Sequence, residues 1–255
     1  MSRAGRLPDA LERGRAASNL ADPVEVVIRA SGVQKVYGRS SSEEGGVAAL
    51  RGVDVVVASC EWTAIVGPSG CGKSTLLNVL AGIDAPTAGT VELLGNDLGR
   101  LDERARARLR LLRVGFVFQR FHLLPVLTAA ENIELPMAEA GVARRDRRQR
   151  SRELLDFVGL GGRTDHRPPQ LSGGEQQRVA IARAVANQPD VVFADEPTGE
   201  LDSRTSAQIL ELFSSLNAHG TTLLTVTHDP EIARRARRVI EMSDGRIVSD
   251  GRPAR

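Results

Sequence analysis

The residues best suited to chemistry form one glycine-rich stretch: Gly67, Pro68, Ser69, Gly70, Cys71, Gly72, Lys73, Ser74 and Thr75. Glycines let a backbone wrap closely around phosphates, and the N–H groups at the start of a helix favour negative charge. We expect Lys73 to reach the β- and γ-phosphates of a bound nucleotide and Ser74 to hold Mg²⁺. Such a pattern arises by chance in about one chain of this length in a hundred. A plain glycine turn before a helix is the alternative, and the other motifs argue against it.

A second candidate is an apolar run, residues 191–194, that ends in the adjacent carboxylates Asp195 and Glu196. Asp195 has the chemistry to hold Mg²⁺ through water. Glu196 is expected to act as the general base that activates the attacking water. A solvated acidic turn at a strand end is the alternative, and the phosphate-binding stretch makes it the weaker one.

The stretch Leu171-Ser172-Gly173-Gly174-Glu175-Gln176-Gln177-Arg178 resembles the signature of ATP-binding cassette (ABC) ATPases. The resemblance runs from about Val24 to Gly251 and implies hydrolysis of ATP, with Mg²⁺, at a composite site between two such domains. It assigns Ser172, Gly173 and Gly174 to the γ-phosphate of the ATP held by a partner. It therefore implies a head-to-tail dimer with a second copy of the chain.

Further matches fall in the family's order and spacing. The resemblance implies that Gln119 senses Mg²⁺ and the attacking water, and that His228 contacts the γ-phosphate. It counts Lys73 among the catalytic residues and the whole stretch from Gly67 to Thr75 among the nucleotide contacts. Tyr37 falls where a family aromatic stacks on adenine, and Asp202 is the acid of a loop at the dimer interface. Taken singly, Gln119 and His228 would more often be polar turn residues, and Tyr37 would more often pack in the core.

Two positions depart from the family pattern. Glu200 stands where relatives usually carry a small or amide residue, and Cys60 stands where glycine is common. Neither departure removes a catalytic residue, so we expect an active ATPase.

The elements that must position these residues alternate between strands and helices. The resemblance implies an α/β fold, a P-loop NTPase (RecA-like) core with an antiparallel β subdomain and an inserted α-helical subdomain at about 128–170. We expect a loose arm at 1–23, a surface loop at 39–46 and the ATPase domain at 24–255. Strands are expected at 24–29, 53–57, 62–66, 90–94, 114–118, 190–194, 221–226, 239–242 and 247–250. Helices are expected at 73–81, 102–112, 130–140, 144–158, 175–186 and 203–216.

The composition argues against some classes of partner and of localisation. The 255 residues carry a net charge of only +2, so there is no bulk electrostatic case for nucleic acid. Two cysteines fit a reducing compartment, and no stretch approaches the ~20 apolar residues of a membrane span. If the protein works at a membrane, another chain must supply the membrane part. Lysine occurs only at Lys35 and Lys73, since every other basic side chain is arginine.

The stretch from Phe116 to Met137 resembles the subgroup that pairs with lipoprotein-release, macrolide-export and antimicrobial-peptide-export permeases. That resemblance implies a cytoplasmic protein on the inner face of the membrane, bound to an integral-membrane permease. We expect exposed Phe121, Leu123 and Leu124 to form part of the permease contact. A cassette that drives a cell-division complex, an importer cassette and a soluble DNA-maintenance ABC ATPase remain the alternatives.

Overall fold

The computed structural model describes residues 25–38 and 46–253. Contacts divide the chain into two compact units that alternate in sequence. The described residues of the strand unit lie within Val24–Arg110, Phe193–Glu196 and Thr222–Arg255, and those of the helical unit lie within Leu111–Val192 and Pro197–Thr221. The arm expected at 1–23, and all but Gly46 of the loop expected at 39–46, lie outside the described residues.

One sheet of the strand unit is antiparallel, with the order β2-β1-β4-β5. Its strands are β1 (Val26–Tyr37), β2 (Val47–Ala58), β4 (Ala88–Leu93) and β5 (Asn96–Asp97). β1 and β2 are much longer than expected, because their pairing continues through register shifts between Ala30 and Gln34. Gly32 and Gly52 lie at these shifts with φ values of 57° and 83°, which only glycine adopts freely. Because the alternation of apolar and polar residues is interrupted at these shifts, the sequence pattern did not predict this part of either strand.

A second sheet contributes the strands β10-β9-β3-β8 to the same unit, followed by the end of β7. These strands are β3 (Trp62–Val66), β7 (Val191–Asp195), β8 (Thr222–Val226), β9 (Arg238–Ser243) and β10 (Arg246–Gly251). β3 pairs in parallel with both β8 and β9 and is buried over its first four residues, as its unbroken apolar run predicts. Asp244 and Gly245 form the turn between the antiparallel strands β9 and β10, with φ values of 47° and 75°.

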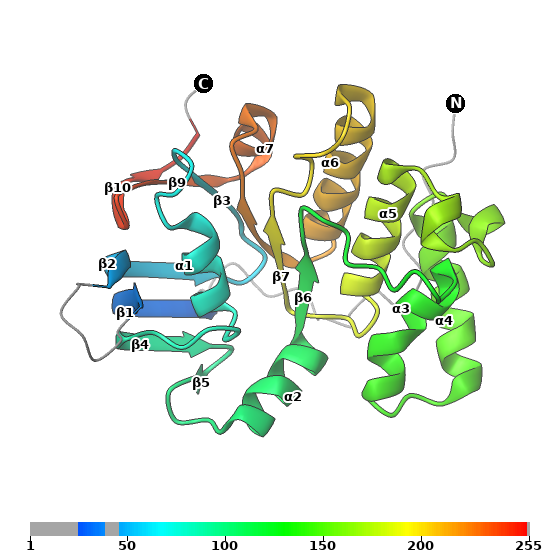
Figure 1. Cartoon of the computed structure of the whole chain (residues 1–255), viewed down its shortest axis with the longest axis horizontal. Helices are drawn as coiled ribbons and strands as arrows, with labels where there is room; N and C mark the ends of the chain where they lie inside the picture. The colour runs from blue at the N-terminus through cyan, green and yellow to red at the C-terminus, as the bar shows by residue number, and fades with distance from the viewer. Residues whose placement is uncertain (1–24, 39–45, 254–255) are drawn as a thin grey trace. The chain divides into compact units, whose positions relative to one another are not determined.

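Helix α1 (Lys73–Leu80) carries the phosphate-binding stretch at its start. It contacts β1, β2 and β4 of one sheet and β8 of the other (Figure 1). Leu76, Leu77, Val79 and Leu80 are buried along it. The strand unit also contains α7 (Pro230–Arg235) and most of α2 (Glu103–Arg113). The first residues of α1 are therefore fixed by a packed core.

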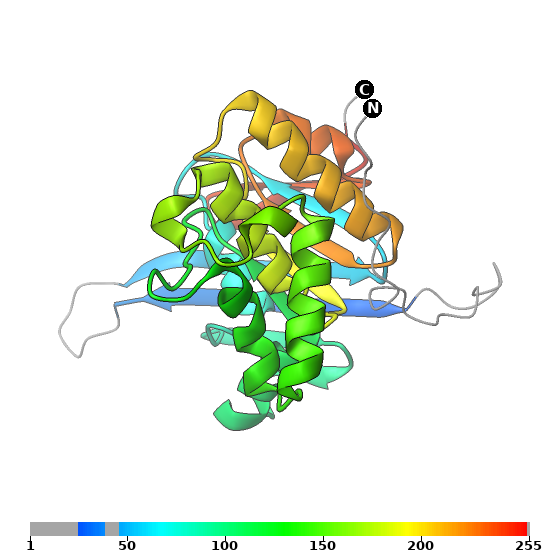
Figure 2. The same ribbon diagram turned by 90° about the vertical axis from the view of Figure 1, so that its right-hand side faces the viewer.

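The helical unit is built around α5 (Gly173–Ala184), which contacts α3 (Ala129–Glu139), α4 (Arg144–Phe157), α6 (Ser203–Ala218) and β6 (Val114–Val117). α3 and α4 pack side by side (Figures 1 and 2). Short 3₁₀ turns at Gly161–Arg163 and Pro168–Gln170 lead from α4 to α5. α5 begins two residues before the expected start because Ser172 caps it.

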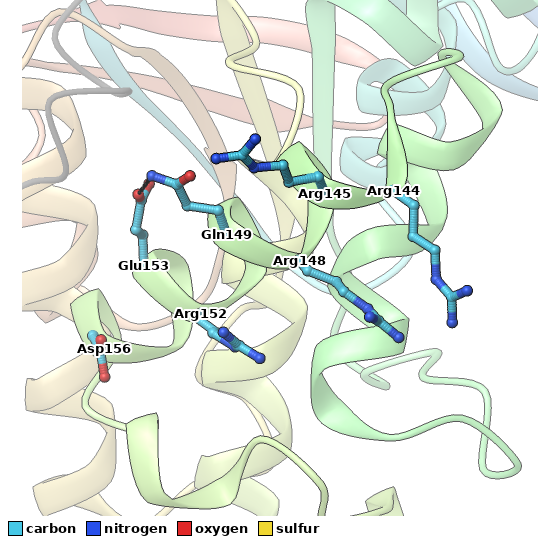
Figure 3. A pocket seen from close by; sticks show the side chains of 7 residues that line it. All are labelled: Arg144, Arg145, Arg148, Gln149, Arg152, Glu153 and Asp156. Carbon is cyan, nitrogen blue, oxygen red and sulfur yellow. Dashed lines mark hydrogen bonds between the residues drawn. The ribbon is translucent and has the colours of Figure 1, made fainter.

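The buried side of α4 carries Leu154 and Leu155, which are fully enclosed, together with Arg150 and Ser151. Its outer side carries an exposed arginine face around a shallow hollow (Figure 3). That face consists of Arg144, Arg145, Arg148 and Arg152. Across 25–38 and 46–253, no helix has both the length and the apolar character to cross a membrane.

Candidate active site

The phosphate-binding stretch adopts a backbone that requires glycine. Gly67, Gly70 and Gly72 have φ values of 148°, 78° and 102°. A Cβ on Gly67 would lie 2.2 Å from the Met242 carbonyl oxygen, and one on Gly72 would lie 2.4 Å from the Ala49 carbonyl oxygen. The loop therefore packs closely against neighbouring strands, and its backbone continues directly into α1.

Lys73 is folded into this loop. Its side chain is only 8% exposed, and Nζ donates to the carbonyl oxygens of Gly67 at 2.8 Å and Pro68 at 2.9 Å. A compact ammonium suits this small space better than a planar guanidinium would. This geometry agrees with the presence of lysine here in a chain whose only other lysine is Lys35.

Ser74 and Asp195 meet in the strand unit. The Ser74 hydroxyl donates to Asp195 Oδ1 at 3.1 Å. Burial raises the pKa of Asp195; the Ser74 hydrogen bond acts to lower that pKa, and the adjacent charge of Glu196 raises it further. A hydroxyl oxygen beside a carboxylate oxygen is the hard donor pair that Mg²⁺ prefers. The side chains present therefore fit this ion.

We predict that Asp195→Asn raises the free energy of unfolding of the nucleotide-free protein at neutral pH, by roughly 1 kcal/mol or less because the partly exposed group is screened. The raised folded-state pKa means that charged Asp195 reduces stability above that pKa. This destabilisation disappears as the pH falls from the folded-state pKa of Asp195 to its ordinary, unfolded-state pKa. Urea unfolding of both proteins across this pH range measures the difference. A difference in the free energy of unfolding between the two proteins that grows as the pH falls would contradict the prediction.

Both the backbone and the side chain of Glu196 are held in place within the strand unit. Its φ is 46°, and its backbone N–H donates to the Val226 carbonyl oxygen at 2.9 Å. Its carboxylate lies 2.9 Å from His228 Nδ1 and accepts hydrogen bonds at 3.3 Å from the Thr227 hydroxyl and the His228 N–H. The sequence suggested separate contacts for Glu196 and His228, whereas the structure joins the two directly. Thr227 was missed, because a threonine at a strand end carries no distinctive signal.

Tyr37 lies in a polar cluster next to the phosphate-binding stretch. Its hydroxyl donates to Asp84 Oδ2 at 2.8 Å and also forms a hydrogen bond with Thr75. Lys35 Nζ binds the other Asp84 oxygen at 2.5 Å and lies 4.9 Å from the centre of the Tyr37 ring. Burial, and next the bond to Asp84, raise the pKa of Tyr37. The ring is fixed but 42% exposed, so a planar base could stack on it. Lys35 and Asp84 were not predicted as part of the site, although the rarity of lysine was a usable signal.

The signature residues lie in the helical unit at the start of α5. The Ser172 hydroxyl accepts from the Glu175 N–H at 3.3 Å, and the Glu175 carboxylate accepts from the Ser172 N–H at 2.8 Å. Gly174 is buried, and a Cβ on it would lie 2.2 Å from Thr205 Cγ2. Gly173 is exposed and has room for a Cβ, which would meet the Phe121 ring at 3.6 Å. The positive end of α5 therefore faces outward at Gly173.

Asp202 is engaged as the N-cap of α6. Its carboxylate accepts from the Thr205 hydroxyl at 2.6 Å and from the N–H groups of Arg204 and Thr205 at 3.0 Å. These bonds, that of the Thr205 hydroxyl first, lower the pKa of Asp202. Glu200, nearby in the same loop, is exposed.

Gln119 is exposed in the helical unit just after β6. The expectation of three exposed apolar residues beyond it was only partly right. Leu124 is 44% exposed, but Phe121 and Leu123 are half-buried. Phe121 is covered because its ring lies against Gly173.

The structure therefore gathers the predicted site residues into two groups. The strand unit holds Tyr37, Gly67 to Thr75, Asp195, Glu196 and His228. The helical unit holds Gln119, Ser172, Gly173, Gly174 and Asp202.

Comparison with known proteins gives the chain its family. The family model described as "ABC transporter" matches residues 50–199. An uncharacterized ABC transporter ATP-binding protein of Thermotoga maritima is 53% identical over 201 residues, which is 79% of this chain and 86% of that protein. The macrolide export ATP-binding/permease protein MacB 1/2 of Paracoccus denitrificans is 48% identical over 226 residues. This match covers 89% of the present chain but only 33% of the MacB protein.

Among solved structures, the ATP-binding cassette MJ0796 is similar in its dimeric, post-hydrolysis state bound to ADP and Pi. The TM-score is 0.82 at 39% identity, with 89% of this chain and 99% of that chain covered. The expected fold and the ATPase chemistry are thus confirmed at the level of the family. The chain belongs to the ABC transporter family and is an ABC ATPase related to MacB-type export ATPases.

Proposed function

We propose that two copies of this chain close head to tail around two ATP molecules and hydrolyse them with Mg²⁺. The observation that carries the proposal is the fixed carboxylate of Glu196, held by His228 and Thr227 directly after β7. In this proposal, the phosphate-binding stretch of one copy holds each ATP, and Gly173 of the other copy faces the γ-phosphate. The dimeric MJ0796 cassette supports the arrangement.

The hydrolytic step follows from the groups in the strand unit. A water oxygen attacks the γ-phosphorus, the bond from that phosphorus to the bridging oxygen breaks, and Glu196 accepts a proton from the water. The exposed His228 is proposed to contact the γ-phosphate while its Nδ1 orients Glu196. Lys73 binds the phosphate oxygens after leaving its two carbonyl partners. Mg²⁺, held by Ser74 and Asp195 with Gln119 as a further contact, would neutralise phosphate charge.

We further propose that the cassette drives an export or release permease supplied by another chain, at the inner face of the membrane. The MacB relatives support this choice: they are named as joint ATP-binding and permease proteins, and this chain spans about a third of their length. Leu124 and Val126, 44% and 73% exposed beyond Gln119, offer an apolar contact. ATP binds the closed dimer more tightly than the open one, so binding drives closure and hydrolysis releases it.

A pull-down tests the choice of partner. Tagged Glu196→Gln protein is incubated with membranes and ATP, and the captured membrane protein is identified. A permease with few spans and a large extracytoplasmic domain supports export or release. A many-span permease with a solute-binding protein, or recovery of only soluble or nucleic-acid-bound proteins, contradicts it.

We predict that Gly173→Asp abolishes ATP-driven dimerisation and steady-state ATPase activity, whereas the monomer still binds ATP. An acid in the first turn of α5 suits the helix dipole, and a Cβ at this exposed position makes only ordinary van der Waals contacts. The same charge would repel a γ-phosphate presented by a second copy. Gel filtration with ATP, in the Glu196→Gln background, measures dimerisation. Gly173→Asn is the uncharged control, and a normal ATP-driven dimer of Gly173→Asp would contradict the assignment.

A further inference from the structure

Gln177 is a buried amide on the helix of the signature, five residues after the cap Ser172. Its side chain is 0% exposed. Its Nε2 donates to the carbonyl oxygens of Pro197, at 2.6 Å, and Phe118, at 3.4 Å. Phe118 immediately precedes Gln119 in the chain, and Pro197 immediately follows Glu196.

The amide is not fully satisfied by these contacts. Gln177 Oε1 is buried and has no hydrogen-bond partner among the described residues. A buried carbonyl without a partner destabilises a fold, so an apolar side chain of this shape would suit packing better. The two donated bonds are therefore what this side chain contributes, and both go to backbone next to proposed active-site residues.

The same helix also binds the backbone that follows Gln119 in the chain. Arg183 is half-buried, and its guanidinium donates to the carbonyl oxygens of Phe121 at 2.9 Å and His122 at 2.5 Å. Burial lowers the pKa of Arg183. His122 is held at a φ of 48°. The backbone around Gln119 is thus attached to α5 on both sides.

We propose that Gln177 is a positioning residue, through which the helix that starts at the signature sets the backbone of Gln119 and of the loop beginning at Pro197. A displacement of α5 when Gly173 meets a partner's nucleotide is then passed to both segments by one side chain. Gln177 itself touches none of the reacting atoms. The inference rests on the proposed roles of Gln119 and of the signature.

Gln177→Met tests the inference, because methionine keeps the length of the side chain and removes both donors. We expect kcat to fall about 10- to 100-fold, as small displacements of catalytic groups cost rates of this size. The Kd for ATP of the monomer is expected to stay within about twofold, since both side-chain hydrogen bonds of Gln177 go to Phe118 and Pro197, outside the phosphate-binding stretch. A changed ATP affinity with unchanged kcat would overturn the proposal.

Asn187→Leu is the matched control. The Asn187 amide also joins two backbone carbonyl oxygens of the helical unit, those of Leu111 at 2.9 Å and Pro136 at 3.0 Å. It lies three residues beyond the end of α5, whereas the signature lies at its start. We expect Asn187→Leu to lower the melting temperature while leaving kcat per folded molecule unchanged. Equal losses of kcat in the two variants would show that Gln177 has only a structural role.

The double variant Gln119→Ala/Gln177→Met distinguishes this inference from the proposed function. If Gln177 acts through Gln119, the double variant is only a few-fold slower than Gln119→Ala alone. If the losses of kcat in the two single variants multiply, the positioning role of Gln177 is overturned, whereas the proposed role of Gln119 still stands. Wild-type kcat in Gln119→Ala would instead overturn the role of Gln119, and with it this part of the inference.

Discussion

Glu196→Gln lowers kcat by about 10²–10⁴, the usual contribution of a general base. Glutamine has nearly the shape of glutamate and can still accept from the Thr227 hydroxyl and the His228 N–H, which now bond to Glu196. It cannot take a proton from water. The affinity for ATP is therefore retained, and the ATP-bound dimer accumulates because the step that releases it is blocked. Phosphate release in a single turnover measures the loss.

Asp229→Asn is a suitable control for Glu196→Gln. Asp229 lies close to His228 in sequence, but its carboxylate caps α7 by accepting from the Glu231 N–H at 2.8 Å. Asparagine caps a helix about as well as aspartate, so kcat and stability are expected to stay close to those of the wild type. A Glu196→Gln variant that turns over at a rate similar to Asp229→Asn would show that another group takes the proton.

Lys73→Ala reduces ATP affinity by about 10²-fold or more, since charge-assisted hydrogen bonds contribute roughly 1.5–3 kcal/mol each. The ammonium is already enclosed by the loop, where Gly67 and Pro68 accept its hydrogen bonds. The phosphates are proposed to take the place of these two carbonyls. Titration with a fluorescent ATP analogue gives the affinity directly.

Lys73→Met separates a loss of charge from a loss of packing. Lys73 is buried, so alanine removes a packed aliphatic stem together with the ammonium. Methionine keeps most of that stem, and we expect it to lose ATP affinity as alanine does but to retain more stability. Unchanged nucleotide affinity in either variant would contradict the assignment of the phosphate-binding stretch.

The elements around the site were predictable because their signals are local. The apolar run from Trp62 to Val66 is strand β3, and the glycine stretch that follows leads into α1 at Lys73, as expected. Strand β7 includes Asp195, one residue beyond the expected end, because the pairing continues to the first carboxylate. Helix α5 begins early because Ser172 and Glu175 cap it reciprocally. These differences amount to one or two residues at element ends, where capping decides the boundary.

Contacts between distant residues could not be read from the sequence. Asp84 bonds both Lys35 and Tyr37 across more than forty residues, and Gln177 reaches Phe118 across 59. Such pairs depend on which strands and helices lie side by side, and one sequence pattern does not encode that. The positive φ of Cys60, 61°, gives a physical reason why relatives carry glycine there, although the sequence alone showed only a departure.

Each ATP site is proposed to be completed by a second copy of the chain. Mixing two inactive variants tests this arrangement. Lys73→Ala lacks a working phosphate-binding stretch, and Gly173→Asp lacks a working signature. A mixed dimer of the two contains one site in which both halves are intact. We predict that ATPase activity absent from either variant alone appears on mixing. Continued inactivity of a demonstrated mixed dimer would contradict a site shared between two copies.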